Sequence, residues 1–155
     1  RGVRLYDIKK ELLEEHFIFY TNYLSQKGKE MEKNNKISML FFWPALQQQV
    51  RIEGVINRVD GAISDAYFES RPRASKIGAW ASNQSDDLDS RDELEKRVFE
   101  FAQKFPSDVP RPPHWGGYAL NAHKIEFWQG RPSRLHDRFV FVKENNNWKV
   151  KRLNP

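Results

Sequence analysis

The sequence predicts a mainly β fold with α-helices (α+β), in which helices pack outside an antiparallel barrel. Two observations carry this prediction. About six or seven segments are apolar, or alternate apolar with polar residues, over strand-like lengths. About two or three segments carry helical caps or helical periodicity, and this ratio of strands to helices is typical of a barrel with peripheral helices.

The chain is expected to begin with a strand and a short helix. HFIFYTNY (16–23) is rich in aromatic and β-branched residues, as strands are. The Ser25 hydroxyl can cap a helix that Asn34–Asn35 would end. A strand over 16–23 and a helix between these caps are therefore predicted.

Two more strands should follow. The nearly continuous apolar run KISMLFFWP (36–44) predicts a buried strand that Pro44 stops. Residues 47–59 alternate apolar and polar side chains and predict a long strand. Gly54 interrupts this alternation, which predicts a bend or a bulge at that position.

The middle of the chain is expected to be helical. Residues 64–72 indicate a helix that ends before Pro72, because the residue preceding a proline disfavours helical angles. Ser90 and Glu93 form a capping-box pattern at the start of the clearest helix, 90–105. The apolar face of this helix is expected to comprise Leu94, Val98, Phe99 and Ala102.

The C-terminal third is expected to be all strand after an extended connector. The connector is PSDVPRPPHWGG (106–117), whose four prolines disfavour a helix. ENNN (144–147) supplies the turn of a final hairpin. Strands are expected near 117–121, 124–129, 138–143 and 147–152.

The composition limits the class of protein. The 155 residues are enough for one domain over 1–155, and no repeat or low-complexity tract suggests a boundary. The absence of Cys excludes a thiolate metal site and cysteine catalysis, and it fits a cytoplasmic location. No apolar run approaches the roughly 20 residues of a membrane span. Because the chain starts with Arg rather than Met, we expect it to be a piece of a longer protein.

The net charge of +5 favours phosphate-bearing partners. Two basic segments of the sequence could bind such a partner. In SRPRASKIGAWASNQS (70–85), Arg71, Arg73 and Lys76 surround Ser75 beside a helix end. Cations and small residues in such a place indicate a phosphate pocket. The competing interpretation is a solvated basic loop.

The second basic segment is EFWQGRPSRLHDRFVF (126–141), which predicts a strand, a turn and another strand. Arg134, His136 and Arg138 alternate along it and should point to one side if the chain is extended. Such a cluster favours an anion or an electron-rich ring as its partner. The alternative is a solvated strand face paired with Asp and Glu from a neighbouring strand.

The remaining histidines and aromatic residues give weaker signals. His16, His114 and His123 lack metal-like spacing, so no metal site is expected. The Trp and Tyr side chains could stack on the bases of a single-stranded nucleic acid, although such residues more often fill a core.

Several stretches together resemble the pyridoxamine 5′-phosphate oxidase (pyridoxine 5′-phosphate oxidase) family. They are FYTNYLSQKGKEME, QQQVRIEG, YFESRPRASKIGAWASNQS, WGGY, EFWQG, RLHDRFVF and the closing RLNP. The resemblance runs from about residue 4 to the last residue, in order. It implies a split β-barrel that binds flavin mononucleotide (FMN) without a covalent bond, as a homodimer with the flavin at the subunit interface.

The resemblance also implies a reaction. The enzyme would oxidise the 4′ carbon of pyridoxamine or pyridoxine 5′-phosphate to give pyridoxal 5′-phosphate. Molecular oxygen would reoxidise the flavin and form hydrogen peroxide. No nucleic acid or membrane partner is implied.

The family's site residues carry over by position. The implied FMN contacts are Arg4, Lys9, Tyr20, Thr21, Lys27, Gln49, Gln84, Ser85, Trp128 and Arg138. The implied substrate contacts are Lys9, Tyr67, Arg71, Ser75, Arg134 and His136. Tyr67, Arg71 and Ser75 would hold the phosphate. Arg134 and His136 would lie over the pyridine ring as the catalytic pair.

The sequence departs from the family pattern at several positions. RLYDIK is the preferred register for the motif that starts the conserved core, with Arg4 and Lys9 at its ends, and a second register starts at Arg1. Gln26 and Gln48 stand where the family usually has Arg. Weaker flavin binding is therefore expected. A catalytically weak flavin- or pyridoxal-phosphate-binding protein of this fold, and a nucleic-acid-binding barrel, are the alternative functions.

Overall fold

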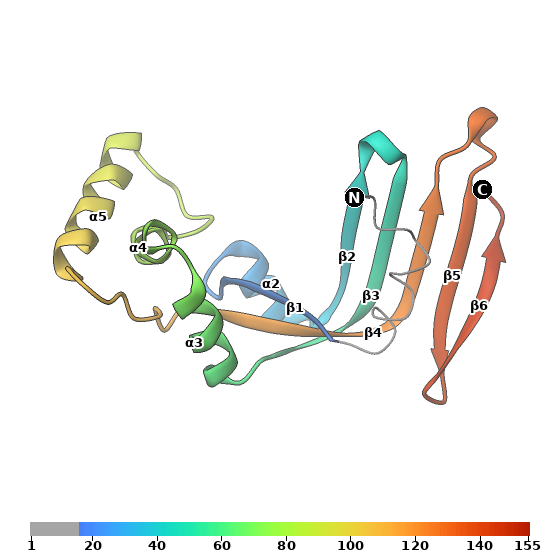
Figure 1. Cartoon of the computed structure of the whole chain (residues 1–155), viewed down its shortest axis with the longest axis horizontal. Coiled ribbons are helices and arrows are strands. Elements are labelled where there is room, and N and C mark those ends of the chain that lie inside the picture. Colours follow the sequence, from blue (N-terminus) through green and yellow to red (C-terminus); the bar gives the residue numbers. More distant parts are fainter. Residues whose placement is uncertain (1–15) are drawn as a thin grey trace. The chain divides into compact units, whose positions relative to one another are not determined.

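The computed structural model describes residues 16–155 (Figure 1). Within this range the chain forms six strands, four α-helices and two short 3₁₀ helices, η1 and η2. In chain order they are β1 (Phe17–Asn22), α2 (Gln26–Lys33), β2 (Lys36–Trp43), η1 (Pro44–Leu46), β3 (Gln48–Arg58), α3 (Gly61–Ser70), α4 (Arg73–Ala81), α5 (Arg91–Lys104), β4 (Trp115–Gln129), η2 (Pro132–Arg134), β5 (Asp137–Glu144) and β6 (Asn147–Leu153).

The strands form one sheet in the order β2-β3-β4-β5-β6, and β1 also pairs with β4. The β2–β3, β4–β5 and β5–β6 ladders are antiparallel. The strands predicted near 117–121 and 124–129 are a single strand, β4, which is 15 residues long. The predicted final hairpin is confirmed, and Asn145 and Asn146 at its turn have the positive φ angles that such tight turns need.

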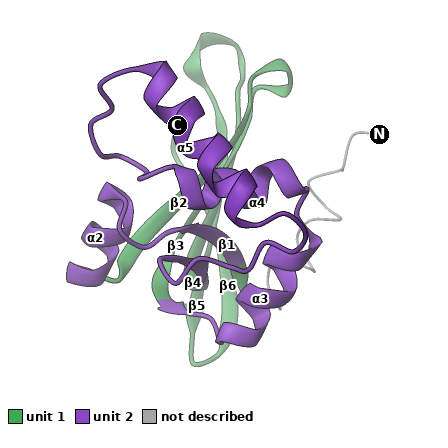
Figure 2. Cartoon of the chain, turned by 90° about the vertical axis from the view of Figure 1, so that its left-hand side faces the viewer, with its two compact units in different colours: residues 1–17, 35–56, 120–155 green, residues 18–34, 57–119 purple. Residues whose placement is uncertain are grey.

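The described chain divides into two compact units, coloured separately in Figure 2. Unit 1 comprises residues 16–17, 35–56 and 120–155 of the described range, and so holds β2, β5, β6 and most of β3 and β4. Unit 2 comprises residues 18–34 and 57–119, and so holds all four α-helices. The single domain expected from the sequence stays a prediction, and each unit is described by itself.

The core of unit 2 lies around Trp115 and Phe68. These two residues cluster with Ile77 and Val109, and the rings of Phe101 and Phe105 pack against the cluster. The apolar face predicted for α5 is therefore wrong in part. Phe99 and Val98, two of its four members, are 65% and 38% exposed, whereas Phe101 and Phe105 lie 5.6 and 5.1 Å from the Trp80 ring of α4.

The core of unit 1 follows the predicted alternation of β3, in which Val50, Ile52 and Ile56 are buried. Gly54 causes no bulge in the β2–β3 ladder, because it pairs with Ile37 in unbroken register. A Cβ at Gly54 would lie only 2.2 Å from the Asn121 carbonyl oxygen. The glycine is needed because two strands approach closely, so the predicted bend or bulge is wrong.

Strand β2 lies at an edge of the sheet and is not the buried strand predicted from its apolar run. Leu40 is 58% exposed and Phe42 is 55% exposed. We call the exposed large side chains of this region the apolar strip: Leu40, Phe41, Phe42, Trp43 and Leu46. Because successive side chains of a strand point to opposite faces, Leu40 and Phe42 lie on one face of β2 and Phe41 and Trp43 on the other. Exposed large apolar side chains gathered in this way indicate an interaction site.

Three of the four α-helices in the described range start at a side-chain cap. The predicted caps of α2 and α5 are confirmed, since Ser25 accepts a hydrogen bond from the Gly28 amide and Ser90 accepts one from the Glu93 amide. Helix α3 starts earlier than predicted because Asp60 caps it through the Ala62 amide. Helix α4 was not predicted at all. Pro72 stands just before its first turn, where a proline is tolerated.

We expect Ser25→Ala to lower the free energy of unfolding by about 1–2 kcal/mol, the usual cost of an N-cap. The Ser25 side chain is fully buried, and its hydroxyl also donates to the Asn22 carbonyl at 2.7 Å. Urea unfolding measures the change. Ser90→Ala removes an exposed cap and is the matched control. Equal costs for the two variants would contradict a special role for the buried hydroxyl.

Candidate functional site

The residues implied by the resemblance occur in both units, and Arg4 and Lys9 lie outside the described residues. In unit 2, three of the implied flavin contacts meet at the end of β1. Lys27 Nζ donates to Thr21 Oγ1 at 3.4 Å, and this hydroxyl donates to Gln84 Oε1 at 3.2 Å. Helix α2 places Lys27 in its first turn, and the buried Thr21 joins it to Gln84, 63 positions away in sequence.

The turn that carries Gln84 is strained at the next residue. Ser85 has a φ of 74°, a left-handed conformation that is uncommon for a residue with a Cβ. Such conformations cluster at ligand sites, where the surrounding structure holds them. Gln26, which replaces the family's Arg, donates to Glu30 at 3.0 Å along the surface of α2.

A stack of aromatic rings adjoins this group. The Tyr20 and Tyr67 rings are parallel with centroids 3.9 Å apart, and the Trp115 ring lies 5.4 Å from Tyr20. Burial, and then the neighbouring Tyr67 hydroxyl, raises the pKa of Tyr20 above its ordinary value. Tyr20 therefore stays a neutral donor near neutral pH. Trp115 was not among the candidate residues, although the WGGY stretch that carries it was part of the resemblance.

Arg71 follows α3 as its C-cap and packs its guanidinium over the ring of Trp115, with 4.8 Å between its Cζ and the ring centroid. Its Nη1 is buried and has no hydrogen-bond partner among the described residues. A buried donor without an acceptor costs roughly 1–3 kcal/mol, more when it is charged. This atom is therefore placed to meet an acceptor that the chain does not supply.

The start of α4 offers more donors for an anion. No side chain caps this helix, and no acidic residue lies in its first turn. Ser75 lies in that turn, half-buried, with a hydroxyl that bonds no described residue. The positive end of the helix dipole, the free hydroxyl and the Arg71 guanidinium favour a phosphate or another oxyanion.

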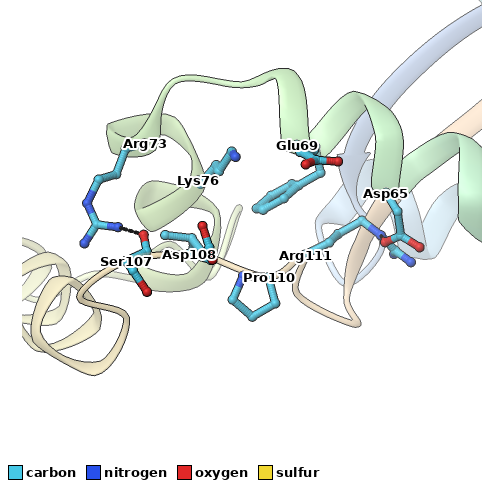
Figure 3. A pocket seen from close by; sticks show the side chains of 10 residues that line it. Asp65, Glu69, Arg73, Lys76, Ser107, Asp108, Pro110 and Arg111 are labelled. Atoms are coloured by element: carbon cyan, nitrogen blue, oxygen red, sulfur yellow. Dashed lines mark hydrogen bonds and ion pairs between the residues drawn. The ribbon is translucent and has the colours of Figure 1, made fainter.

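Arg73 was predicted to belong to a phosphate pocket, but its side chain bonds the backbone of a neighbouring segment instead. Its guanidinium donates to the backbone oxygens of Phe105 and Ser107, both at 2.5 Å, and so fixes the end of α5. Figure 3 shows the hydrogen bond between Arg73 and Ser107 at the edge of a cavity of about 430 Å³. Across the cavity, Arg111 pairs with Asp65 at 2.6 Å. None of the implied site residues lines this cavity.

In unit 1, the implied contacts Trp128 and Arg138 lie directly opposite each other on β4 and β5. Arg138 Nε donates to Glu126 Oε1 at 2.7 Å, and its Nη1 donates to the Asn154 carbonyl at 3.1 Å. The hydrogen bond to Glu126 raises the pKa of Arg138 above its ordinary value. Glu126 was missed as a candidate, although a carboxylate inside the apolar stretch IEFW was a visible signal.

The turn between these strands is not the extended chain predicted for its basic residues. Ser133 and Arg134 have φ angles of 57° and 61°, so Arg134 ends the short helix η2 in a left-handed conformation. Arg131 pairs with Asp137 at 2.8 Å, and Arg138 pairs with Glu126. The alternative of a cation paired with an acidic residue of a neighbouring strand thus holds for Arg138. Arg131, which was not part of the predicted cluster, is paired as well. Arg134 is exposed and has no bonded partner among residues 16–155.

His136 borders a cavity of about 340 Å³ in the same unit. Its ring centroid lies 4.7 Å from that of Trp128, and its Nδ1 accepts a hydrogen bond from the Arg131 amide at 3.1 Å. Other residues that line this cavity are Phe42, Pro44, Gln47, Gly130 and Arg131. A wall that contains the Phe42 and Trp128 rings, with the Arg131 cation beside it, suits a flat, electron-rich ligand.

The two glutamine side chains of β3, Gln48 and Gln49, differ in whether they bond other residues. Gln48, which replaces the family's Arg, donates to Gln129 Oε1 at 2.9 Å. Gln129 in turn donates to the Leu46 carbonyl at 3.1 Å, so this pair braces the η1 turn. The side chain of Gln49 bonds no described residue and keeps its amide free for a ligand. The described residues contain no cluster of His, Asp or Glu that could hold a metal ion.

Comparisons with known proteins decide the family. Residues 6–105 match the sequence model of pyridoxamine 5′-phosphate oxidase, and residues 115–155 match that of the pyridoxine 5′-phosphate oxidase C-terminal dimerisation region. The chain belongs to the pyridoxamine 5′-phosphate oxidase family. The resemblance drawn from the sequence motifs is thereby confirmed.

Curated relatives of this family support the assignment. The pyridoxine/pyridoxamine 5′-phosphate oxidase of Bordetella pertussis is 54% identical over 140 residues, which cover 90% of this chain and 66% of the relative. The enzyme of the same name from Rubrobacter xylanophilus is 50% identical over 143 residues, covering 92% of this chain and 66% of the relative. The chain thus spans just under two thirds of the length of these relatives.

Solved structures confirm the fold of a split β-barrel with α-helices. PhzG from Burkholderia lata, in complex with tetrahydrophenazine-1-carboxylic acid, gives a TM-score of 0.83 at 32% identity, covering 91% of this chain and 69% of that chain. An FMN-binding protein from Nostoc punctiforme gives a TM-score of 0.70 at 14% identity, covering 100% and 77% of the two chains. At that identity the second likeness concerns the fold alone. No helix in the described range is both long and apolar enough to span a membrane.

Proposed function

We propose that the protein is an FMN-dependent oxidase that converts pyridoxamine or pyridoxine 5′-phosphate to pyridoxal 5′-phosphate, with oxygen as the electron acceptor and hydrogen peroxide as a product. The observation that carries this proposal is the buried Nη1 of Arg71, which lacks a partner among the described residues. It lies in the chain just before the uncapped start of α4. A substrate phosphate would supply the acceptor oxygens that both features need.

The phosphate would be held by three side chains of unit 2. Arg71 would donate from its guanidinium, and Ser75 and Tyr67 from their hydroxyls. Tyr67 lies in the last turn of α3 and Arg71 is its C-cap, and both side chains lie near the Trp115 ring, whose centroid is 6.2 Å from that of Tyr67 and 4.8 Å from Arg71 Cζ. Stacking on Tyr20 fixes the plane of the Tyr67 ring.

The residues present also fit FMN. Of the residues proposed to contact it, Tyr20, Thr21, Lys27, Gln84 and Ser85 belong to unit 2, and Gln49, Trp128 and Arg138 belong to unit 1. Lys27 makes only a long bond of 3.4 Å, and the Gln49 amide bonds no described residue, so both keep donors for a flavin. When bound, FMN would accept the hydride from the substrate carbon and pass its electrons to oxygen. The protein's part is to align the two rings and exclude water.

Arg134 and His136 would act on the pyridine ring. Arg134 would present a planar cation to the ring or its oxygens, and its left-handed backbone gives this side chain a fixed starting direction. His136 would make a hydrogen bond to the substrate from beside the Trp128 ring. This division leaves the redox chemistry to the cofactor and the positioning to the chain.

We further propose that the active form is a cytoplasmic homodimer with FMN at its interface. The match of residues 115–155 to a dimerisation region supports this proposal. The apolar strip on β2 supports it as well, because such a surface is costly to leave in water. A second copy of the chain would cover the strip.

Leu40→Glu is therefore expected to reduce the mass in solution from that of two chains to that of one, 18.4 kDa. A charge placed among apolar residues at a buried interface is strongly unfavourable. Light scattering coupled to size exclusion measures the mass. Phe99→Glu is the control, since Phe99 is 65% exposed on α5 in the other unit and should not affect the mass. A Leu40→Glu protein that remains dimeric would contradict the proposed use of the strip.

The direct test of the function is aerobic turnover by the FMN-loaded protein. Pyridoxal 5′-phosphate and hydrogen peroxide are expected to appear in equal amounts from pyridoxamine 5′-phosphate. The likeness to PhzG supplies a second candidate substrate class, reduced phenazine carboxylic acids. Turnover of a tetrahydrophenazine carboxylic acid but not of the B6 phosphates would support that candidate. Bound flavin without turnover of either would support a binding protein.

A further inference from the structure

A single carboxylate joins the last turn of α2 to two strands. Glu32 Oε1 accepts hydrogen bonds from Arg58 Nε at 3.0 Å and Arg58 Nη2 at 2.6 Å, and from the Tyr118 hydroxyl at 3.2 Å. Arg58 ends β3, and Tyr118 belongs to β4. The hydrogen bond from Arg58, and then its charge, lower the pKa of Glu32, so the carboxylate stays charged near neutral pH. We call Glu32, Arg58 and Tyr118 the α2 clamp.

The α2 clamp is a network and not an isolated ion pair. The Glu32 and Arg58 side chains are 51% and 50% exposed, and a lone pair at such exposure would contribute little. Here the carboxylate is also the acceptor for the hydroxyl of Tyr118, a buried residue. The Arg58 guanidinium carbon lies 4.0 Å from the centroid of the Tyr23 ring, which adds a cation–π contact. Several shared contacts of this kind restrain a helix more than one surface pair does.

The other end of α2 is held by the turn that contains Tyr23. A Cβ at Gly28 would lie only 2.1 Å from the Tyr23 carbonyl oxygen, so the helix packs directly on this backbone. The Tyr23 amide donates to the His114 carbonyl at 2.7 Å. A Cβ at Gly116 would lie 1.9 Å from the Tyr23 hydroxyl oxygen, so the ring is enclosed as well. The turn and the clamp together fix both ends of an eight-residue helix.

Helix α2 carries Lys27, a proposed flavin contact, in its first turn. Lys27 Nζ makes one long hydrogen bond, 3.4 Å to Thr21 Oγ1, and no other bond to a described residue holds it. Gln26, which stands where the family usually has Arg, donates to Glu30 and adds no cation beside Lys27. The position of the Lys27 ammonium therefore depends on the orientation of the helix itself.

We propose that the α2 clamp positions Lys27 for the phosphate of FMN. Glu32 and Arg58 are positioning residues, since they act through the helix and bond neither Lys27 nor its partner Thr21. This role rests on the flavin contacts proposed above. All of these residues belong to unit 2.

The first test is calorimetric titration of the apoprotein with FMN. Arg58→Met removes both donors from Glu32 and keeps an apolar side chain beside Tyr23. We expect this variant to bind FMN about fivefold more weakly, the effect of one lost network contact, with kcat at saturating FMN nearly unchanged. Glu30→Gln, which changes an exposed carboxylate of the same helix, is the matched control and should bind FMN as the wild type does. Unaltered FMN binding by Arg58→Met would overturn the proposal.

The second test asks whether the clamp acts through Lys27. Lys27→Met should weaken FMN binding by about tenfold or more, because it removes a charge-assisted hydrogen bond to a phosphate. The double variant, Lys27→Met with Arg58→Met, should bind FMN no more weakly than Lys27→Met alone. Independent sites would instead multiply their effects, to a loss of about 50-fold or more. Such a multiplied loss would overturn the positioning role.

A purely structural clamp gives a different result. It would lower the free energy of unfolding without changing FMN affinity, which is the pattern expected of Ser90→Ala at the cap of α5. Urea unfolding of each variant makes this comparison, and a destabilised Arg58→Met protein with normal FMN affinity would contradict the proposal.

The outcomes also separate this inference from the proposed function. A wild-type protein that binds FMN but turns over no B6 phosphate would count against the function, while the titrations would still measure the effect of the clamp. A wild-type chain that binds no FMN would overturn both. Weakened FMN binding in Arg58→Met that disappears in the Lys27→Met background would support the clamp whichever substrate the protein oxidises.

Discussion

Arg71→Met is expected to raise the KM for pyridoxamine 5′-phosphate by about 100-fold or more, because charge-assisted hydrogen bonds to a phosphate contribute about 1.5–3 kcal/mol each. The Met side chain keeps the packing on Trp115 and Phe68, which lie 4.8 and 5.5 Å from the guanidinium carbon. The flavin absorbance should be unchanged. Steady-state kinetics with purified, FMN-loaded protein measures the effect.

The stability of this variant makes the prediction sharper. Since Nη1 of Arg71 is buried without a partner, its removal should leave the free energy of unfolding unchanged or slightly higher. Arg73→Met is the matched control two positions away. It should lower the free energy of unfolding by about 1 kcal/mol, since Arg73 binds backbone oxygens at the end of α5, and leave KM nearly unchanged. A destabilised Arg71→Met protein with normal KM would contradict the phosphate role.

Arg134→Ala is expected to lower kcat by about 100-fold or more with little change in FMN binding, a typical effect of removing one preorganised electrostatic contact. Arg134→Lys keeps the charge without the planar fork and should recover only part of the rate. Turnover and FMN titration on the same preparations measure both effects. Equal losses of FMN binding and turnover would contradict the assignment of Arg134 as a substrate contact.

The backbone of Arg134 supplies an independent readout. At a φ of 61° a glycine avoids the cost of the Cβ, so Arg134→Gly should be more stable than Arg134→Ala by about 1 kcal/mol. Both variants should be equally slow, because the guanidinium is what the reaction uses. Residues that trade stability for activity in this way are typical of functional sites. Urea unfolding of the two variants tests the difference.

Local signals in the sequence were enough for much of the fold. The caps at Ser25 and Ser90 and the alternation of β3 act within a few residues, so a single stretch contains them. Helix α4 was missed because Pro72 resembles a helix stop when it in fact precedes a helix start. The apolar run of β2 predicted a buried strand. Hydrophobicity alone does not show whether the residues that bury a strand belong to the same chain or to a partner.

In the candidate site, too, the sequence predicted which residues take part but not the contacts that depend on the folded chain. The motif spacing identified Arg71 and Ser75 as candidate phosphate contacts. It could not show that the Arg73 guanidinium instead donates hydrogen bonds to backbone oxygens at the end of α5. The positive φ angles of Ser133 and Arg134 were invisible because no glycine marks them. The bond from Arg131 to His136 spans five residues of an irregular turn, which no helical or strand periodicity describes.

The central claim is that this chain oxidises a phosphorylated B6 vitamer through a bound flavin. The most direct measurement is the visible spectrum of the FMN-loaded protein before and after anaerobic addition of pyridoxamine 5′-phosphate, followed by admission of air. We predict that the flavin band bleaches with the substrate and returns with oxygen, and that the Arg71→Met protein needs far more substrate to bleach. A stable flavin band that ignores the substrate would contradict the account.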